Sequence, residues 1–135
     1  MSAPPTLSLQ DLASIKRNID QIRVAMLTTQ DPGGQLRTRP MATHQLDADG
    51  TMWFFTHNDS NKVSHIRQQP NVALGFSNPQ TQVSVAISGQ AQIVSDQARV
   101  NQLWDDALLD WFPEGKDDPN IVLLKVTIAS GECWE

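Results

Sequence analysis

Short β-prone segments separated by turn residues are the feature that most limits how this chain can fold. Apolar residues alternate with small or polar ones in two adjacent segments, at Val72, Leu74 and Phe76 and at Val83, Val85 and Ile87. Similar segments lie at 24–29, 35–46, 51–56 and 121–128, and 132–135 is a candidate for one more. Helices do not alternate with the strands and no Gly-x-Gly-x-x-Gly motif occurs, which disfavours a parallel nucleotide-binding sheet. The pattern predicts an α+β fold of mainly antiparallel strands in hairpin order, curled into a barrel with peripheral helices.

Three segments have the spacing of amphipathic helices. Ser8 is the expected N-cap of the first, whose apolar residues recur every three or four positions, at Leu9, Leu12, Ile15, Ile19 and Ile22. The second is expected from Asn61 to Gln69, because Pro70 cannot continue a helix. The third begins at Ser95 and Asp96 and keeps one apolar face as far as Trp111.

Composition and charge exclude several classes of function. The chain of 135 residues is expected to form one domain, residues 1–135. Its net charge is −5 and it has no basic run, so a nucleic-acid partner is disfavoured, whereas a phosphorylated small molecule needs only one or two cations. Cys133 is the only cysteine, so no intramolecular disulfide can form. The first residues lack the features of a signal peptide and no apolar run could cross a membrane, so a cytoplasmic location is expected.

The segment from Phe55 to Lys62 has the arrangement of an anion site. A β-prone stretch ending in Thr56 leads into a polar loop, and a helix is expected to begin at Asn61. The free N–H groups of a helix start attract anions, and Ser60 can donate its hydroxyl to a phosphate oxygen. The charge of Lys62 is unfavourable in a first helical turn, and a bound anion would remove that conflict. An ordinary capping serine followed by a solvated lysine has the same residues, and both interpretations stay open from this segment alone.

A second candidate is the strand segment around Arg39. Alternation places Arg37, Arg39 and Met41 on one face of the strand. Pro40 lacks the N–H that a central strand needs, so the segment is expected at a sheet edge or a bulge. From there Arg39 can contact a ligand, while Arg37 is better explained as a solvated side chain.

The sequence does not predict a metal site or a nucleophile. His44, His57 and His65 lack partners at metal-ligand spacing and are expected on the surface. No Gly-x-Ser-x-Gly motif or other nucleophile pattern occurs. Trp111 is expected to pack in the core, although a tryptophan at a helix end can also reach a neighbouring pocket. No catalytic residue is assigned.

In combination, these motifs resemble the flavin-binding split barrels related to pyridoxamine phosphate oxidase. The resemblance is carried by residues 39–41, 53–56, 60–62 and 83–89. Residues 103–104 and 111–119 are similar to the bacterial general stress protein branch of that superfamily. The match in order and spacing covers nearly the whole chain, from about Leu12 to Trp134.

The resemblance implies a six-stranded split barrel that pairs into a homodimer, with one flavin in each of two interface clefts. The implied cofactor is FMN, with FAD, the deazaflavin coenzyme F420 or haem as alternatives on the same fold. The implied cofactor-binding residues are Ser60, Asn61 and Lys62 around the phosphate, and Arg39 at the phosphate or the ribityl chain. Pro40, Met41, Phe55 and Thr56 are implied along the isoalloxazine ring, with Ser84 on the facing strand. Trp111 is a further implied contact, for which the partner subunit is one source.

Two features depart from the oxidases themselves. Asn61 stands where they have an arginine, which weakens the expected phosphate binding. The chain stops at Glu135 without the arginine- and histidine-bearing segment that holds their pyridoxal substrate, so pyridoxamine phosphate oxidase activity is disfavoured. The resulting prediction is an FMN-binding oxidoreductase that acts on an unidentified small molecule. The alternative is a non-catalytic flavin-binding stress protein.

Overall fold

The computed structural model describes residues 9–42, 46–47 and 49–134. The predicted cap at Ser8 and the histidine at position 44 lie outside these residues. In chain order the elements are α1 (Leu9–Ile19), β1 (Val24–Gln30), β2 (Leu36–Ala42), β3 (Thr51–His57), α2 (Asn61–Gln68), β4 (Asn71–Asn78), β5 (Val83–Val94), α3 (Gln97–Leu103), the 3-10 helix η1 (Asp106–Asp110) and β6 (Ile121–Trp134). None of the helices in the described residues has the length and apolar content needed to cross a bilayer.

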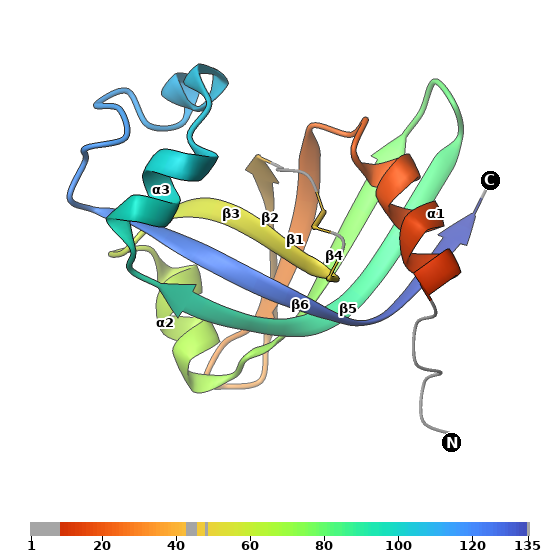
Figure 1. Ribbon diagram of the computed structural model, residues 1–135. Helices are drawn as coiled ribbons and strands as arrows, with labels where there is room; N and C mark the ends of the chain where they lie inside the picture. The colour runs from red at the N-terminus through yellow and green to blue at the C-terminus, as the bar shows by residue number, and fades with distance from the viewer. Residues whose placement is uncertain (1–8, 43–45, 48, 135) are drawn as a thin grey trace.

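The six strands form one antiparallel sheet in the order β2-β1-β4-β5-β6-β3. The sheet curls until its two edge strands, β2 and β3, contact each other without pairing, which leaves the barrel split between them (Figure 1). The predicted α+β split barrel is therefore confirmed. The expected hairpin order is wrong for β3, because this strand pairs with β6 rather than with β2, which precedes it in the chain.

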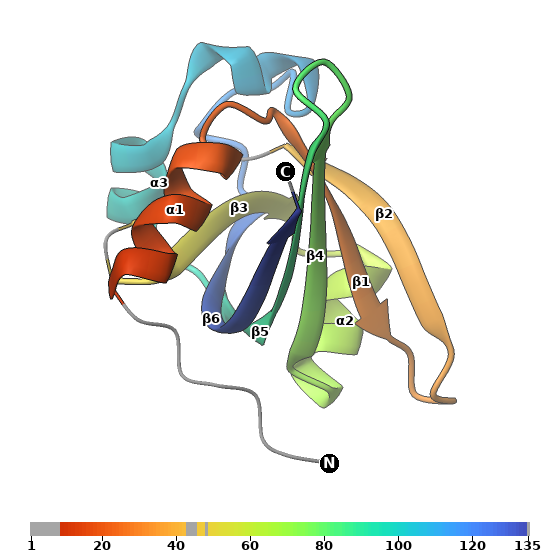
Figure 2. The ribbon, with the colours of Figure 1, turned by 90° about the vertical axis from the view of Figure 1, so that its right-hand side faces the viewer.

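The interior of the barrel is filled by the inward rows of the strands. Its most deeply buried side chains include Leu27, Phe54, Leu74, Ile87 and Leu124. α1 and α2 lie at opposite ends of the curled sheet, and the last part of β6 runs beside α1 (Figures 1 and 2). One contact there is the hydrogen bond from Asn18 Nδ2 to Cys133 Sγ at 3.2 Å.

A second, smaller cluster lies on the outer face of β3. Trp53 and Phe55 point away from the barrel interior and pack beneath α3 and η1, so β3 is buried on both faces although it is an edge strand. The predicted single helix from Asp96 to Trp111 is wrong. α3 ends at Leu103, and the side chain of Asp105 begins η1 by accepting the N–H of Ala107 at 2.9 Å. An aspartate that offers the backbone a local acceptor interrupts a helix in this way.

β6 continues through residues 132–134 and forms no separate strand there. The β5–β6 register shifts between Ser88 and Gly89. A Cβ atom at Gly89 would lie 2.5 Å from the carbonyl oxygen of Thr127, so only glycine permits this close approach of the two backbones.

Candidate functional site

Arg39 lies on the inward face of the edge strand β2. The β1–β2 register places Leu27 opposite Arg39 and Thr29 opposite Arg37. Ala25, Leu27 and Thr29 are all buried, so the inward row of β1 begins apolar and ends in a hydroxyl group. Arg39 reaches diagonally across the strand pair, and its Nη1 donates to the Oγ1 of Thr29 at 2.6 Å.

Lys62 lies in the first turn of α2 and points back toward β3. Its Nζ donates to the Oγ1 of Thr56 at 2.9 Å, and Thr56 is buried. Burial lowers the pKa of the Lys62 ammonium below its ordinary value, and the charge of the neighbouring Arg39 guanidinium lowers it further. Two cations from distant parts of the chain therefore meet at the split between β2 and β3.

Neither Arg39 nor Lys62 pairs with a carboxylate in the part of the chain that the structure describes. The two ion pairs found there join other residues, Lys16–Asp20 and Arg37–Asp31. Burial also lowers the pKa of Arg39, and the charge of Arg37 adds to this. Two partly buried like charges without a counter-charge are costly, and a bound anion offsets that cost.

Ser60 is the N-cap residue of α2, but its hydroxyl does not cap the helix. The Oγ atom of Ser60 is buried and has no hydrogen-bond partner within the described residues. A buried hydroxyl without a partner is uncommon, because it has lost its hydrogen bonds to water. Its place at a helix start, two residues before Lys62, adds a free donor to the two cations. The arrangement is suited to a phosphate group, with two charges and a hydroxyl in one corner of the barrel.

The other residues predicted on β2 divide between the two faces of the strand. Met41 is buried in the core and shares the inward row with Arg39. Pro40 is exposed on the outer face opposite Met26, and its strand is a sheet edge, as its missing N–H predicts. Arg37 is exposed and pairs with Asp31 at 3.6 Å.

Phe55, Asn61 and Ser84 lie in three different environments. The ring of Phe55 packs edge-on against Trp104 at 5.8 Å in the outer cluster, so the ring points away from the cation pair. Asn61 is exposed at the first position of α2. Ser84 lies near the start of β5. α2 leads into β4, whose first residue, Asn71, pairs with Gln90 farther along β5. Ser84 and Gln90 are six positions apart on this strand, a span of roughly 20 Å, so Ser84 does not join the cation pair within one subunit.

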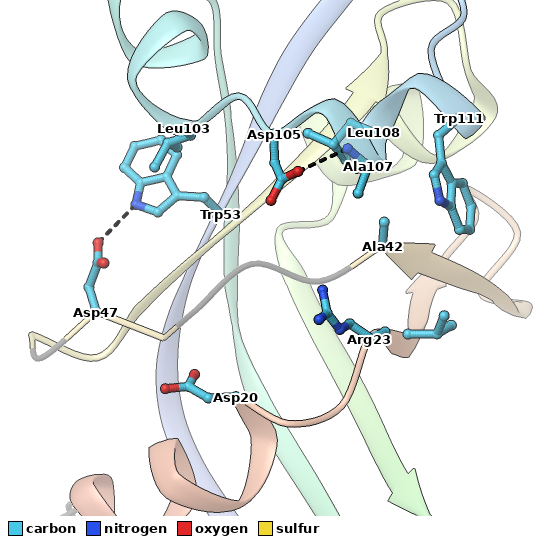
Figure 3. Close-up of a pocket in the computed structure, with 11 residues that line it drawn as sticks. Asp20, Arg23, Ala42, Asp47, Trp53, Leu103, Asp105, Ala107, Leu108 and Trp111 are labelled. Carbon is cyan, nitrogen blue, oxygen red and sulfur yellow. Dashed lines mark hydrogen bonds between the residues drawn. The ribbon is translucent and has the colours of Figure 1, made fainter.

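Trp111 lines a cavity of about 490 Å³ beneath η1 (Figure 3). Figure 3 shows its indole above Ala42, the last residue of β2, with Asp47 at the other end of the cavity. The apolar lining comes mainly from Trp53, Leu103 and Leu108. Because Ala42 follows Met41 directly, the cavity lies next to the strand that carries Arg39. Trp111 is 42% exposed, which contradicts its expected place in the core and leaves its ring available to a ligand.

Thr29 is a site residue that the sequence reasoning missed. The signal was present in the inward row of β1, where the apolar residues Ala25 and Leu27 are followed by a threonine. A threonine at such a position needs a hydrogen-bond partner, and the partner can be found only when the register with Arg39 is known.

His57 and His65 do not form a metal centre with other residues that the structure describes. No group of three or more metal-ligating side chains is brought together there. His57 and His65 are half-buried rather than on the surface. His57 stacks on Phe112 at 4.6 Å and its Nδ1 lies 3.3 Å from Asn120 Nδ2, so it links the loop before α2 to the segment before β6.

The class of protein is a six-stranded split barrel with two cations at its split, and comparison with known proteins gives the family. Residues 10–135 match the family described as pyridoxamine 5'-phosphate oxidase like, and the chain belongs to this family. It is 30% identical over 83 residues to General stress protein 26 of Bacillus subtilis, covering 56% of each. It is 26% identical over 137 residues to Protein bli-3 of Neurospora crassa, covering 94% of this chain and 64% of that protein. The chain thus spans less than two thirds of the length of either relative.

Solved structures share the fold over nearly the whole chain. A protein related to general stress protein 26 from Clostridium acetobutylicum has a TM-score of 0.81 at 20% identity, covering 96% of this chain and 91% of that one. The general stress FMN/FAD binding protein of Xanthomonas citri has a TM-score of 0.76 at 28% identity, covering 90% of this chain and 85% of that one.

Proposed function

We propose that this protein binds FMN and acts as a flavin-dependent oxidoreductase on a small molecule. The observation that carries the proposal is the buried, unpartnered hydroxyl of Ser60 beside two cations that lack an acidic partner in the described residues. Arg39, Ser60, Lys62 and the first N–H groups of α2, beginning near Asn61, would hold the phosphate.

FMN fits this corner better than the other cofactors considered. Its terminal phosphate monoester carries nearly two negative charges at neutral pH, which matches two cations. FAD carries a pyrophosphate and the deazaflavin a phosphodiester, both with less charge on each phosphate, and haem carries carboxylates. The general stress protein of Xanthomonas citri is named as an FMN/FAD binding protein, which supports a flavin as the ligand of this protein.

The isoalloxazine ring would extend from the phosphate corner along the backbone of Pro40, Met41, Phe55 and Thr56. A bound flavin supplies hydride and single-electron transfer chemistry. The protein would fix its phosphate, keep water from one face of the ring through the barrel wall, and hold a reactant in the adjoining cavity. Trp111 would lie over that reactant or over the ring edge. None of these steps needs an acid or base from the chain.

The cavity beneath η1 favours an enzyme over a flavin-carrying stress protein without catalytic activity. A volume of about 490 Å³ is within the range of small-molecule pockets. Reduction of the bound flavin by a nicotinamide nucleotide, followed by reoxidation by a second compound, would support the enzyme. Flavin that is bound tightly but stays inert to every donor would support the non-catalytic alternative.

A homodimer with flavin at the interface is also proposed. On β1 and β2 the outward row contains Val24, Met26 and Leu36, which are 44%, 43% and 69% exposed. The outward positions of β4 and β5 are also free of charged residues, among them Ala73, Gly75, Ala86 and Ser88. Such an uncharged sheet face fits a second copy of the chain. A partner could also bring Ser84 to the flavin. Dilution to monomer should release the cofactor, and a flavin-loaded monomer in sedimentation would contradict the interface.

The test of the FMN proposal is a titration of flavin-free protein with FMN, followed by flavin fluorescence. Combining Ser60→Ala with Lys62→Ala should weaken binding by a few kcal/mol, because hydrogen bonds to charged groups are each worth about 1.5–3 kcal/mol. Lys116→Ala removes an exposed lysine elsewhere and serves as the matched control. Unchanged FMN affinity in the double variant would show that the phosphate assignment is wrong.

A further inference from the structure

Two buried threonine hydroxyls accept hydrogen bonds from the two cations. Thr29 is 1% exposed and holds Arg39 at 2.6 Å, and Thr56 is 2% exposed and holds Lys62 at 2.9 Å. We propose that Thr29 and Thr56 are positioning residues that aim Arg39 and Lys62 at one phosphate, and that they thereby make the protein select FMN over riboflavin. This inference rests on the proposed function and names the source of its ligand selectivity.

The fold alone does not explain either hydroxyl. Thr29 continues a row whose other buried members are Ala25 and Leu27, and Thr56 follows Phe54 on the inward face of β3. Valine has nearly the same shape as threonine and the same preference for strands. A buried hydroxyl is unfavourable unless it is hydrogen-bonded. At both positions the side-chain hydrogen bond that the structure records goes to a cation.

A neutral acceptor has an advantage over a carboxylate at these positions. Arginine and lysine side chains lose considerable rotamer freedom when they are fixed, so holding them before a ligand arrives reduces the entropy cost of binding. A carboxylate would also hold them, but it would cancel the charge that attracts the phosphate. A hydroxyl fixes each cation and leaves its charge intact. The pKa of Lys62 is lowered, in part by Arg39, which is consistent with two charges that stay uncompensated.

The two hydrogen bonds hold Arg39 and Lys62 from opposite sides of the split, as expected if both cations bind one ligand. Arg39 belongs to β2 and Lys62 to α2, and the two threonines belong to β1 and β3. β2 and β3 are the two edges of the split, so the hydroxyls hold one cation from each side of it. An anion between the edges can contact both cations at once.

The experiment compares the dissociation constants of FMN and riboflavin, which differ only in the phosphate. For Thr29→Val we expect FMN binding to weaken about tenfold, because a hydrogen bond that orients a charge is lost. Riboflavin binding should change less than about twofold, so the ratio of the two constants falls. Thr29→Ser keeps the hydroxyl and should restore the ratio. Thr56→Val should behave like Thr29→Val and provides a second test if one variant folds poorly.

Two further variants separate positioning from general stability. Thr51→Val removes a hydroxyl from another buried threonine of β3, at the far end of the strand, and should leave the ratio unchanged. In an Arg39→Met background, Thr29→Val should have no further effect on FMN binding, because Thr29 acts through Arg39.

The outcomes distinguish this inference from the proposed function. If the unaltered protein binds FMN no better than riboflavin, the phosphate site and this inference both fail. If it prefers FMN and Thr29→Val and Thr56→Val keep that preference, only the positioning role is wrong. Equal weakening of FMN and riboflavin would also overturn it, since that pattern indicates a disturbed fold.

Discussion

Arg39 lies close enough to Lys62 for its guanidinium to lower the pKa of the Lys62 ammonium, although the two residues come from an edge strand and a helix. Proteins usually separate like charges or place an acid between them. Here the acceptors are two threonine hydroxyls, and no carboxylate pairs with either cation within the described residues. Within the described residues this corner therefore has two cations and no acidic partner, which is the arrangement that the proposed phosphate site requires.

Inorganic phosphate should stabilise the flavin-free protein. A ligand that binds only the folded state adds about 1.4 kcal/mol to the free energy of unfolding at ten times its Kd. The melting temperature should therefore rise in phosphate compared with chloride at equal ionic strength. Lys62→Met should lose most of this difference, whereas Lys116→Met should keep it. An equal rise in both variants would indicate a general salt effect.

The affinity for FMN should fall at both alkaline and acid pH. Binding needs a protonated Lys62, and burial and Arg39 lower the pKa of this group from its ordinary 10.5 in the free protein. Affinity should therefore begin to fall at a pH below that of an ordinary lysine. It should also fall below about pH 6, where the phosphate gains a proton. Riboflavin titrated over the same range should lack the acid change and corrects for the alkaline ionisation of the isoalloxazine ring itself. Lys62→Met should lose the part of the alkaline fall that riboflavin does not share.

Trp111→Ala should distinguish the role of the cavity from the role of the phosphate corner. Trp111 is 42% exposed, so its loss should change the free energy of unfolding by less than about 1 kcal/mol. FMN affinity should stay within about threefold, while the rate of flavin reduction by an effective donor falls by an order of magnitude or more. Leu109→Ala is the matched control, since Leu109 is 43% exposed on η1 and does not line the cavity. Equal rates for the two variants would exclude Trp111 from the reactant site.

Gly89→Ala should destabilise the barrel strongly. The new methyl group would lie 2.5 Å from the Thr127 carbonyl oxygen, and backbone on both sides must move to admit it. Overpacking of this kind costs about 1–3 kcal/mol. Gly33→Ala, in the turn between β1 and β2, meets only the Asp31 side chain at 3.4 Å, which is an ordinary contact, and should be close to neutral. Urea unfolding of both variants measures the difference, and similar midpoints would contradict the close approach of β5 and β6.

Local patterns in the sequence were sufficient for most of the strands and for the short helix before Pro70, although they divided the continuous β6 into two segments. Alternation determined which residues of β4 and β5 face the core, because one face of each strand is exposed. The pairing of β3 with β6 could not be predicted in the same way, since both strands are buried over much of their length and lack a clear alternation. The break between α3 and η1 depends on one side-chain cap, which competes with a continuous apolar face.

The candidate site was predictable only in part for the same reason. Ser60 and Lys62 were found because a helix start and a polar loop are local features. Arg39 was found because a proline marks an edge strand. The contact between Arg39 and Thr29, and the place of Trp111 beside Ala42, depend on strand register and on how a loop returns to the barrel. Neither is determined by neighbouring residues in the chain.

The two cations without an acidic partner in the described residues should also affect how fast the protein is degraded in a cell. An empty barrel keeps their repulsion, and a loaded barrel does not, so the ligand-free chain is the form that opens more readily. Proteases act on opened chains. If the corner holds a phosphorylated ligand as proposed, the amount of this protein that accumulates should follow the supply of that ligand.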